Sequence, residues 1–273
     1  MNVRSVRNMM IRSVYISVML IAGLFLTGCA VTSSSLTPEI QHVLAPTGTL
    51  RVALYTGTPT SLVSAADPRG VGHDLGTELA RRLGVPVDIM VFPKNDDVLE
   101  AIKTGRADVA FTNASAERAT GMDFTQPYLL IEMGFLAAND AGIAVLADVD
   151  KPGIRVGATA NSTSAIVLLR DLKNAKLVTA QSVGAGIEML AKGQAEVYAT
   201  NKATLYKMSE KLPGSHVLDG NWGFEHHALA IPKGRDLGLP FARQFISDVI
   251  TEGFVKNAIE RAGLRGGIVA PPQ

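Results

Sequence analysis

The clearest chemistry in the sequence lies in the polar stretch 112–118 (TNASAER), which follows a short apolar run. Arg118 ends this stretch, and a guanidinium offers a planar fork of donors that holds a carboxylate through two parallel hydrogen bonds. The hydroxyls and the amide before it add further polar contacts. The residues alone support two interpretations equally. One is a carboxylate-binding site at Arg118, and the other is a surface ion pair of Arg118 with Glu117 or Asp123.

This stretch ends a segment that the chain repeats. VLEAIKTGRADVAFTN (98–113) aligns without gaps with GIEMLAKGQAEVYATN (186–201). Each copy predicts a helix, a glycine and a strand that ends in a Thr-Asn pair. Chance similarity of helix–glycine–strand junctions is the alternative, but sixteen aligned positions with the same polar end favour a true repeat.

Two copies far apart in the chain are too few for a solenoid, and they predict two similar halves instead. Ligands of open α/β sheets bind beyond the carboxyl ends of the strands, which is where both Thr-Asn pairs would lie. The repeat therefore predicts a ligand cleft between two facing lobes.

The rest of the chain alternates strands and helices, which indicates mostly parallel sheets. Apolar extended runs at 129–138 and 228–231 predict two segments that cross between the lobes. We expect an α/β fold of two lobes, each a mostly parallel sheet flanked by helices, joined by two crossing strands. Lobe 1 comprises 49–138 and 228–273, and lobe 2 comprises 139–227.

The N-terminus indicates the compartment. Three arginines precede the apolar run 14–26, which is shorter than the ~20 residues of a transmembrane helix and is typical of a secretory signal. The run ends in Leu-Thr-Gly-Cys, which resembles the bacterial lipobox and makes Cys29 the lipidated first residue of the mature protein. We expect a signal peptide at 1–28, a tether at 29–48 and a lipid-anchored periplasmic protein, on the outer membrane if the host is Gram-negative. An ordinary signal peptide with a leftover thiol is the alternative.

Composition narrows the classes of function. The 26 basic and 25 acidic residues balance and form no basic stripe with interleaved aromatics, so we expect no nucleic-acid partner. A single cysteine excludes an internal disulfide. His226 and His227 are neighbours in an extended run and would point to opposite faces of a strand, so we expect no metal site. Nothing in the sequence indicates another cofactor.

Five segments together resemble the family-3 solute-binding proteins of ABC importers, the group that binds amino acids and similar polar molecules. In chain order they are LRVALY, GVGHDLGTELARRLGVPVDI, VLEAIKTGRADVAF, SAERATGMDFTQPY and IRVGATANSTSA, and the match runs from about Gly48 to the C-terminus. The resemblance implies a two-lobed periplasmic-binding-protein fold that closes on a small polar solute with a carboxylate. It also implies no enzymatic activity, ABC permease subunits as partners, and a monomer.

The resemblance assigns roles to several residues. SAER places Arg118 where the family's arginine clamps the α-carboxylate of the ligand. Asn113 stands where the family has a hydroxyl, in a loop with Ser115 that is shorter than the family's pattern. The second-lobe turn, which binds ligand at a helix N-terminus in the family, corresponds to Asn161, Ser162 and Thr163.

Asn201 departs from the family. In amino-acid binders an aspartate at the corresponding position holds the ammonium group of the ligand, and an amide cannot supply that charge. Glu225 or His227 can reach the cleft from the returning crossing segment.

Three residues at strand ends or in the first polar turn complete the expected ligand site: Tyr55, Thr58 and Phe92. Tyr55 and Phe92 either stack on the ligand or belong to the core. Two rivals to transport remain on the same fold. One is a periplasmic enzyme of the dehydratase or lyase type, which would need an acid or base in the cleft. The other is a ligand-binding subunit of a membrane sensor.

Overall fold

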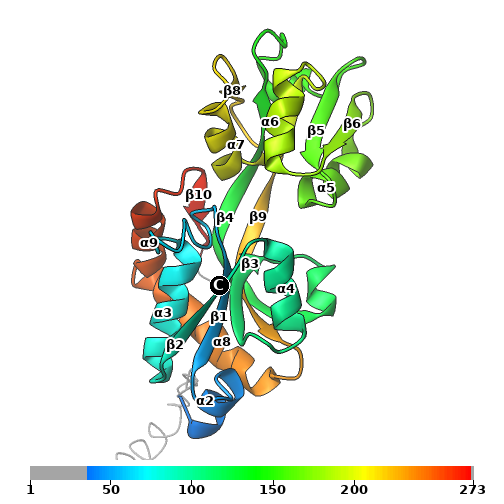
Figure 1. Cartoon of the computed structure of the whole chain (residues 1–273). Coiled ribbons are helices and arrows are strands. Elements are labelled where there is room, and N and C mark those ends of the chain that lie inside the picture. The colour runs from blue at the N-terminus through cyan, green and yellow to red at the C-terminus, as the bar shows by residue number, and fades with distance from the viewer. Residues whose placement is uncertain (1–35, 272–273) are drawn as a thin grey trace, which may run out of the picture. The chain divides into compact units, whose positions relative to one another are not determined.

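The computed structural model describes residues 36–271, in which the strands form one continuous sheet of ten strands (Figure 1). Its helices are α2 (Pro38–Leu44), α3 (Val71–Leu83), α4 (Asn95–Lys103), α5 (Thr163–Asp171), α6 (Val183–Ala191), α7 (Lys202–Ser209), α8 (Leu239–Thr251) and α9 (Phe254–Ala262). Its strands are β1 (Leu50–Tyr55), β2 (Val87–Phe92), β3 (Val109–Asn113), β4 (Met122–Ala137), β5 (Arg155–Thr159), β6 (Lys176–Ala180), β7 (Val197–Asn201), β8 (His216–Val217), β9 (Gly223–Pro232) and β10 (Gly267–Val269).

The strands β4 and β9 are shared by two lobes. β4 pairs with β9 in antiparallel fashion from Met122 to Met133, and its other end pairs with β7 from Met133 to Ala137. β9 also pairs with β3, so both strands run from one lobe to the other (Figure 1). The main order of the sheet is β2-β1-β3-β9-β4-β7-β5-β6, which places a parallel trio of strands on each side of the antiparallel pair. The predicted two-lobed α/β fold with two crossing strands is confirmed.

Helices cover both faces of the sheet in each lobe. In lobe 1, apolar residues of α3, α8 and α9 pack with Leu54 and Phe111, while α4 places Ile102 in a second cluster with the alternate residues of β1 and β3. In lobe 2, α5 packs through Leu168 in one cluster, and α6 and α7 pack in another that includes Leu205. Because side chains alternate along a strand, each pair of clusters occupies the two opposite faces of its lobe.

Aligned residues of the repeat make the same contacts in the two lobes. The carboxylate of Asp108 accepts hydrogen bonds from the backbone N–H of Arg51 at 2.9 Å and from its guanidinium, whose Nη2 also donates to the carbonyl of the repeat's glycine at 3.0 Å. Glu196 accepts the corresponding bonds from Arg155, whose Nη2 donates to the second glycine carbonyl at 2.7 Å. Asp108 is fully buried and also contacts Arg235 at 2.9 Å, so the first copy is the more enclosed.

The segment expected to be a tether at 29–48 contains a helix, which corrects that prediction. Thr37 caps α2 by accepting a hydrogen bond from the N–H of Ile40 at 3.2 Å, and Leu44 at its end is fully buried in lobe 1. Gln41 donates from its side chain to a carbonyl at the end of α3. A helix of two turns carries too few apolar residues to show a periodic pattern, so the sequence pattern did not indicate it.

No helix within residues 36–271 is both long and apolar enough to cross a membrane. The expected signal peptide at 1–28 and the lipidation site at Cys29 lie outside the described residues.

Candidate ligand-binding site

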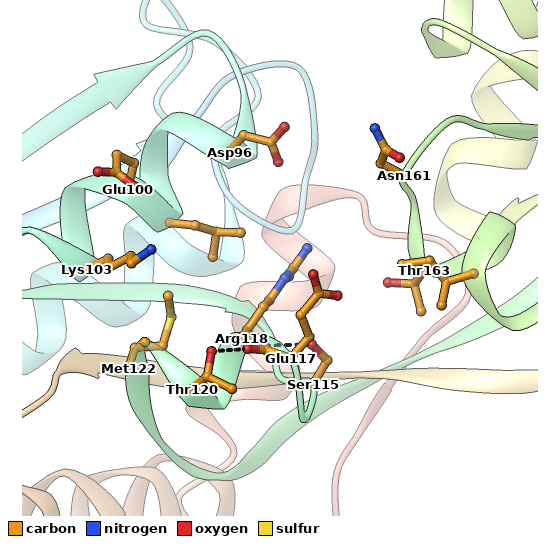
Figure 2. Close-up of a pocket in the computed structure, with 13 residues that line it drawn as sticks. Asp96, Glu100, Lys103, Ser115, Glu117, Arg118, Thr120, Met122, Asn161 and Thr163 are labelled. Carbon is orange, nitrogen blue, oxygen red and sulfur yellow. Dashed lines mark hydrogen bonds between the residues drawn. The ribbon is translucent and has the colours of Figure 1, made fainter.

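Residues of both lobes line a cavity of about 440 Å³. Lobe 1 contributes the loop after β3, including Ser115 and Arg118, together with the polar face of α4. Lobe 2 contributes Asn161 and Thr163 from the turn before α5, and Ile166 from its first turns (Figure 2). The structure thus brings the loop that follows the first repeat and the second-lobe turn to one cavity.

One edge of the Arg118 guanidinium is hydrogen-bonded within lobe 1, and the other edge is free of partners among the described residues. It begins a short 3-10 helix (Arg118–Thr120), and its backbone N–H donates to the Ser115 hydroxyl at 3.2 Å. Its Nη1 donates to the carbonyl of Asn113 at 2.8 Å and to the Thr112 hydroxyl at 3.3 Å. Among residues 36–271, Nε and Nη2 have no acceptor and no carboxylate forms a salt bridge with Arg118. Figure 2 shows the side chain reaching into the cavity, so the free side of the fork can receive a carboxylate.

The second-lobe wall of this cavity is the start of α5. Asn161 has a left-handed backbone with φ of 59°, a conformation that asparagine tolerates better than most residues. The hydroxyl of Ser162 accepts a hydrogen bond from the N–H of Ala165 at 3.2 Å and so caps the helix. Ser162 lies outside the cavity lining, whereas Asn161 and Thr163 belong to it. The free N–H groups of a helix N-terminus favour an anion here.

Asn113 connects the two walls. Its side-chain Nδ2 donates to the Thr163 hydroxyl in lobe 2 at 3.5 Å, and its Oδ1 accepts from the backbone N–H of His226 at 2.8 Å. The residue is buried, so this amide spans from lobe 1 to lobe 2 through the protein interior. Both Nδ2 and Oδ1 of Asn113 therefore already have hydrogen-bond partners within the protein.

Acidic residues that the sequence interpretation did not include also face this cavity. Asp96 and Glu100 come from α4 and Glu117 from the Arg118 loop, and Figure 2 shows Glu117 beside Arg118. None of them forms a salt bridge with Arg118 within the described part of the chain. Their spacing at i and i+4 on α4 was the available signal for two of them.

A second cavity, of about 520 Å³, lies between the first polar turn and α7. Tyr55 and Thr58 line it from lobe 1, and Asn201 and Lys207 line it from lobe 2. The Nζ of Lys207 donates to the carbonyl of Gly57 at 3.2 Å, which links α7 to the turn. Burial lowers the pKa of this ammonium group. Lys207 was not foreseen, because its spacing on α7 is that of an ordinary surface lysine.

Tyr55 is a half-buried residue of the second cavity, and several effects act on the pKa of its phenol. Burial raises the pKa of its phenol, and a hydrogen bond with Thr60 opposes that shift. The charge of Glu225 raises the same pKa and the charge of Arg118 lowers it.

Asn201 is the cap of α7. Its Oδ1 accepts a hydrogen bond from the N–H of Thr204 at 3.0 Å, and its Nδ2 donates to Oε2 of Glu225 at 3.1 Å. The same carboxylate oxygen lies 3.3 Å from Nε2 of His227. Glu225 and His227 lie two residues apart on the same face of β9, and their side chains are only 14% and 5% exposed. Glu225 therefore places a carboxylate beside Asn201.

Two aromatic residues, the candidate Phe92 and Trp222, lie away from both cavities. Phe92 packs in the lobe 1 cluster on the α4 side, and the Arg106 guanidinium lies 6.0 Å from its ring centroid. Trp222 donates from Nε1 to the carbonyl of Gly134 at 3.0 Å and packs against Phe135 in lobe 2. Of the three residues at strand ends or in the turn, Tyr55 and Thr58 therefore line a cavity and Phe92 does not.

Within residues 36–271 no group of three or more His, Cys, Asp or Glu is arranged to hold a metal ion. The first cavity offers the open guanidinium of Arg118, the carboxylates of α4 and Glu117, and the amide of Asn161. The second offers the hydroxyl of Thr58, the amide of Asn201 and the ammonium group of Lys207. Glu225 on β9 contacts Asn201 but lines neither cavity.

Comparison with known proteins agrees with this architecture. The sequence model of a family described as bacterial extracellular solute-binding proteins, family 3, matches residues 50–216. That range includes Arg118, the turn before α5 and Asn201, and it ends before Glu225. No curated protein sequence matches the chain.

Solved structures match over most of their length. An amino acid ABC transporter substrate-binding protein from Streptococcus pneumoniae, bound to L-arginine, is 23% identical with a TM-score of 0.65, covering 81% of this chain and 97% of its own. A solute receptor for L-cysteine from Neisseria gonorrhoeae is 20% identical with a TM-score of 0.67, covering 83% and 94%. An ancestral amino acid-binding protein, described as a precursor of cyclohexadienyl dehydratase, is 24% identical with a TM-score of 0.65, covering 81% and 97%. At these identities the structures show a common fold.

Proposed function

Because the chain belongs to family 3 of the bacterial extracellular solute-binding proteins, we propose that it is the binding component of an ABC importer. In this proposal it closes its lobes on a small polar solute that carries a carboxylate. One observation supports this most directly: Arg118 has a free donor edge that faces a cavity lined by both lobes. Two of the similar structures are of proteins that receive amino acids, which makes amino acids and related compounds the first solutes to test.

Closure would strengthen the contact that Arg118 makes. The lobes share β4 and β9, and such a connection permits hinge motion of the two lobes as near-rigid bodies. Removing water from around a guanidinium–carboxylate pair lowers the local dielectric constant and increases the attraction. Thr163 and the N-terminus of α5 would meet the bound carboxylate from the opposite wall.

The family places the protein outside the cytoplasm. In our proposal Cys29 carries the lipid that anchors it to a membrane, and the closed form is what the permease recognises. The proposal further includes a monomer that needs no cofactor.

The experiment is isothermal titration of the full chain in detergent with the twenty L-amino acids and a set of small carboxylates. Binding of at least one carboxylate is expected, and Arg118→Ala should weaken it by about 100-fold, since charge-assisted bidentate bonds are among the strongest. Arg170→Ala is the matched control, because Arg170 is 75% exposed and pairs only with its neighbour Asp171. A folded protein that binds no carboxylate, or an Arg118→Ala variant with wild-type affinity, would refute the proposal.

A second function deserves a direct test because of one observation. Glu225 and His227 place a carboxylate and an imidazole 3.3 Å apart beside Asn201, which lines the second cavity, and such a pair can move protons. An enzyme would convert its ligand, whereas a binding protein returns it unchanged. Overnight incubation of the protein with each ligand found by titration, followed by proton NMR of the ligand, separates the two functions.

A further inference from the structure

We propose that Glu225 supplies the negative charge that holds a cationic group of the solute, at a place where the second repeat itself offers only the Asn201 amide. This inference rests on the proposed function and narrows it to solutes that carry both a carboxylate and an ammonium, amine or guanidinium group. Glu225 lies outside the residues that match the family, so the family's pattern does not assign it a role.

The first argument is the environment of the carboxylate. The comparably enclosed acids Glu78 and Asp108 each contact two arginines. Glu225 is 14% exposed, and within residues 36–271 its only basic neighbour within 4 Å is His227. A carboxylate removed from water without a cationic partner costs free energy, and a bound cation would offset that cost.

The second argument is which oxygen is occupied. Asn201 and His227 both contact Oε2 of Glu225, at 3.1 Å and 3.3 Å. Oε1 accepts no hydrogen bond from the described residues, and it is not among the side-chain atoms sealed from solvent without a partner. One oxygen therefore fixes the carboxylate in place and the other remains able to accept from a ligand N–H.

The third argument is that the neighbours donate and do not compete. The amide of Asn201 uses its oxygen to cap α7, so only its N–H group faces Glu225. A carboxylate oxygen can only accept, so the contact with His227 requires a proton on Nε2 of the imidazole. Both neighbours thus donate hydrogen bonds to Oε2 of Glu225. An aspartate at 201 would instead place two negative groups at hydrogen-bonding distance.

The fourth argument is proximity to the opposite charge. Asn201, which contacts Glu225, lines the second cavity together with Tyr55, and Arg118 lines the first cavity. The charges of Glu225 and Arg118 both act on the pKa of the Tyr55 phenol. A solute that extends from the first cavity to the second would place its carboxylate at Arg118 and its cationic group beside Glu225. Neither charge has a strong partner of opposite sign among the described residues, so each is available to the solute.

The test compares matched solutes on matched variants. The probes are the twenty L-amino acids and their 2-hydroxy-acid counterparts, together with the side-chain pairs lysine with norleucine and arginine with citrulline. The variants are Glu225→Gln, which keeps the shape and the bond from Asn201, Arg118→Ala, and Glu260→Gln as a control on the exposed face of α9.

We expect the wild-type protein to prefer the cation-bearing member of at least one pair by 30-fold or more. Glu225→Gln should weaken binding of that member at least 10-fold and change binding of its neutral counterpart less than 3-fold, while Arg118→Ala weakens both. Glu260→Gln should match the wild type. Thermal unfolding of each free variant shows that it is folded.

Two results overturn the inference while the proposed function stands. One is a Glu225→Gln variant that keeps the wild-type preference, and the other is a wild-type protein that binds carboxylates without preferring the cation-bearing member. If the wild-type protein binds no carboxylate at all, the proposed function fails and this inference fails with it.

Discussion

The amide of Asn201 donates a hydrogen bond of 3.1 Å to Oε2 of Glu225, which joins the end of the second repeat to the strand that returns to lobe 1. The corresponding amide in the first repeat, Asn113, instead uses its oxygen to accept from the backbone of the same strand at 2.8 Å. The two repeats therefore end on β9 in different ways. One fixes a backbone and the other positions an acid.

Asn201→Asp should destabilise the free protein at neutral pH. The new carboxylate would face Glu225 at hydrogen-bonding distance, and two carboxylates that share a site raise the pKa of one of them. A carboxyl whose pKa is raised on folding reduces stability above that pKa, and the loss is recovered as the pH falls through it. We expect a loss of roughly 1–3 kcal/mol at pH 7 that shrinks at pH 5, measured by urea unfolding.

The double variant Asn201→Asp with Glu225→Gln is the control for that prediction. It has one carboxylate in the pair, so its stability should differ little between pH 7 and pH 5. It should also bind a cation-bearing solute better than Glu225→Gln alone, because the charge has moved and not disappeared. Equal stability of Asn201→Asp at the two pH values would show that the side chains do not face each other.

Arg118→Lys should weaken carboxylate binding by about 10- to 50-fold, although it keeps the positive charge. Lysine is a point charge without the planar fork, so it cannot contact the loop carbonyl at 2.8 Å and also grip a carboxylate with two parallel bonds. Titration calorimetry with the solute found for the wild-type protein measures the effect. Wild-type affinity in this variant would mean that only the charge matters.

The two matched ion pairs of the repeat should differ in their contribution to stability. Asp108→Asn leaves two arginines facing a fully buried amide and should cost about 3–5 kcal/mol. Glu196→Gln should cost only about 0.5–1.5 kcal/mol, because its partner Arg155 is 40% exposed. Urea unfolding monitored by circular dichroism compares them, and equal losses would contradict the difference in enclosure.

Acid should weaken lobe 1 partly through Glu78. Hydrogen bonds from Arg81 lower the pKa of this carboxyl to about 2, with a further contribution from Arg82 and against the effect of burial. Since the folded pKa lies below the ordinary value of 4.5, the stabilisation is complete above pH 4.5 and is lost as the pH falls through about 2. It amounts to roughly 1–2 kcal/mol once solvent screening is allowed for.

The variant Glu78→Gln measures this contribution. It should be less stable than the wild type at pH 6, and the difference should narrow as the pH falls toward 2. Glu260→Gln is the control, since it removes an exposed carboxylate from α9 without touching Glu78. A difference that is the same at every pH would assign the effect to packing and not to charge.

The fold was predictable because its signals are local or repeated. Two copies of one helix–glycine–strand segment predicted two lobes, and apolar runs at 129–138 and 228–231 predicted the strands that connect them. The helix α2 was missed because its burial depends on Leu44 meeting residues far away in the chain, which no short pattern records.

The candidate site was predictable only where a motif carries it. Arg118, Asn161 and Thr163 line one cavity, and their role in binding a ligand stays a prediction, whereas the hydroxyl of Ser162 in the same motif caps its own helix. The pairing of Asn201 with Glu225 depends on how a helix in lobe 2 meets β9, a relation that is absent from either local sequence. Contacts between residues that are distant in the sequence could be identified only from the structure.

Glu225 does not lie on either wall of the cleft but on β9, one of the two strands that both lobes share. In our proposal a solute that meets Arg118 alone would rest on one lobe and leave the shared strands untouched. A solute that also meets Glu225 would contact one of the two shared strands, which form the hinge between the lobes. Many carboxylates would then bind weakly in our proposal. Only solutes that also carry the positive charge would bring about the closed form that the permease recognises.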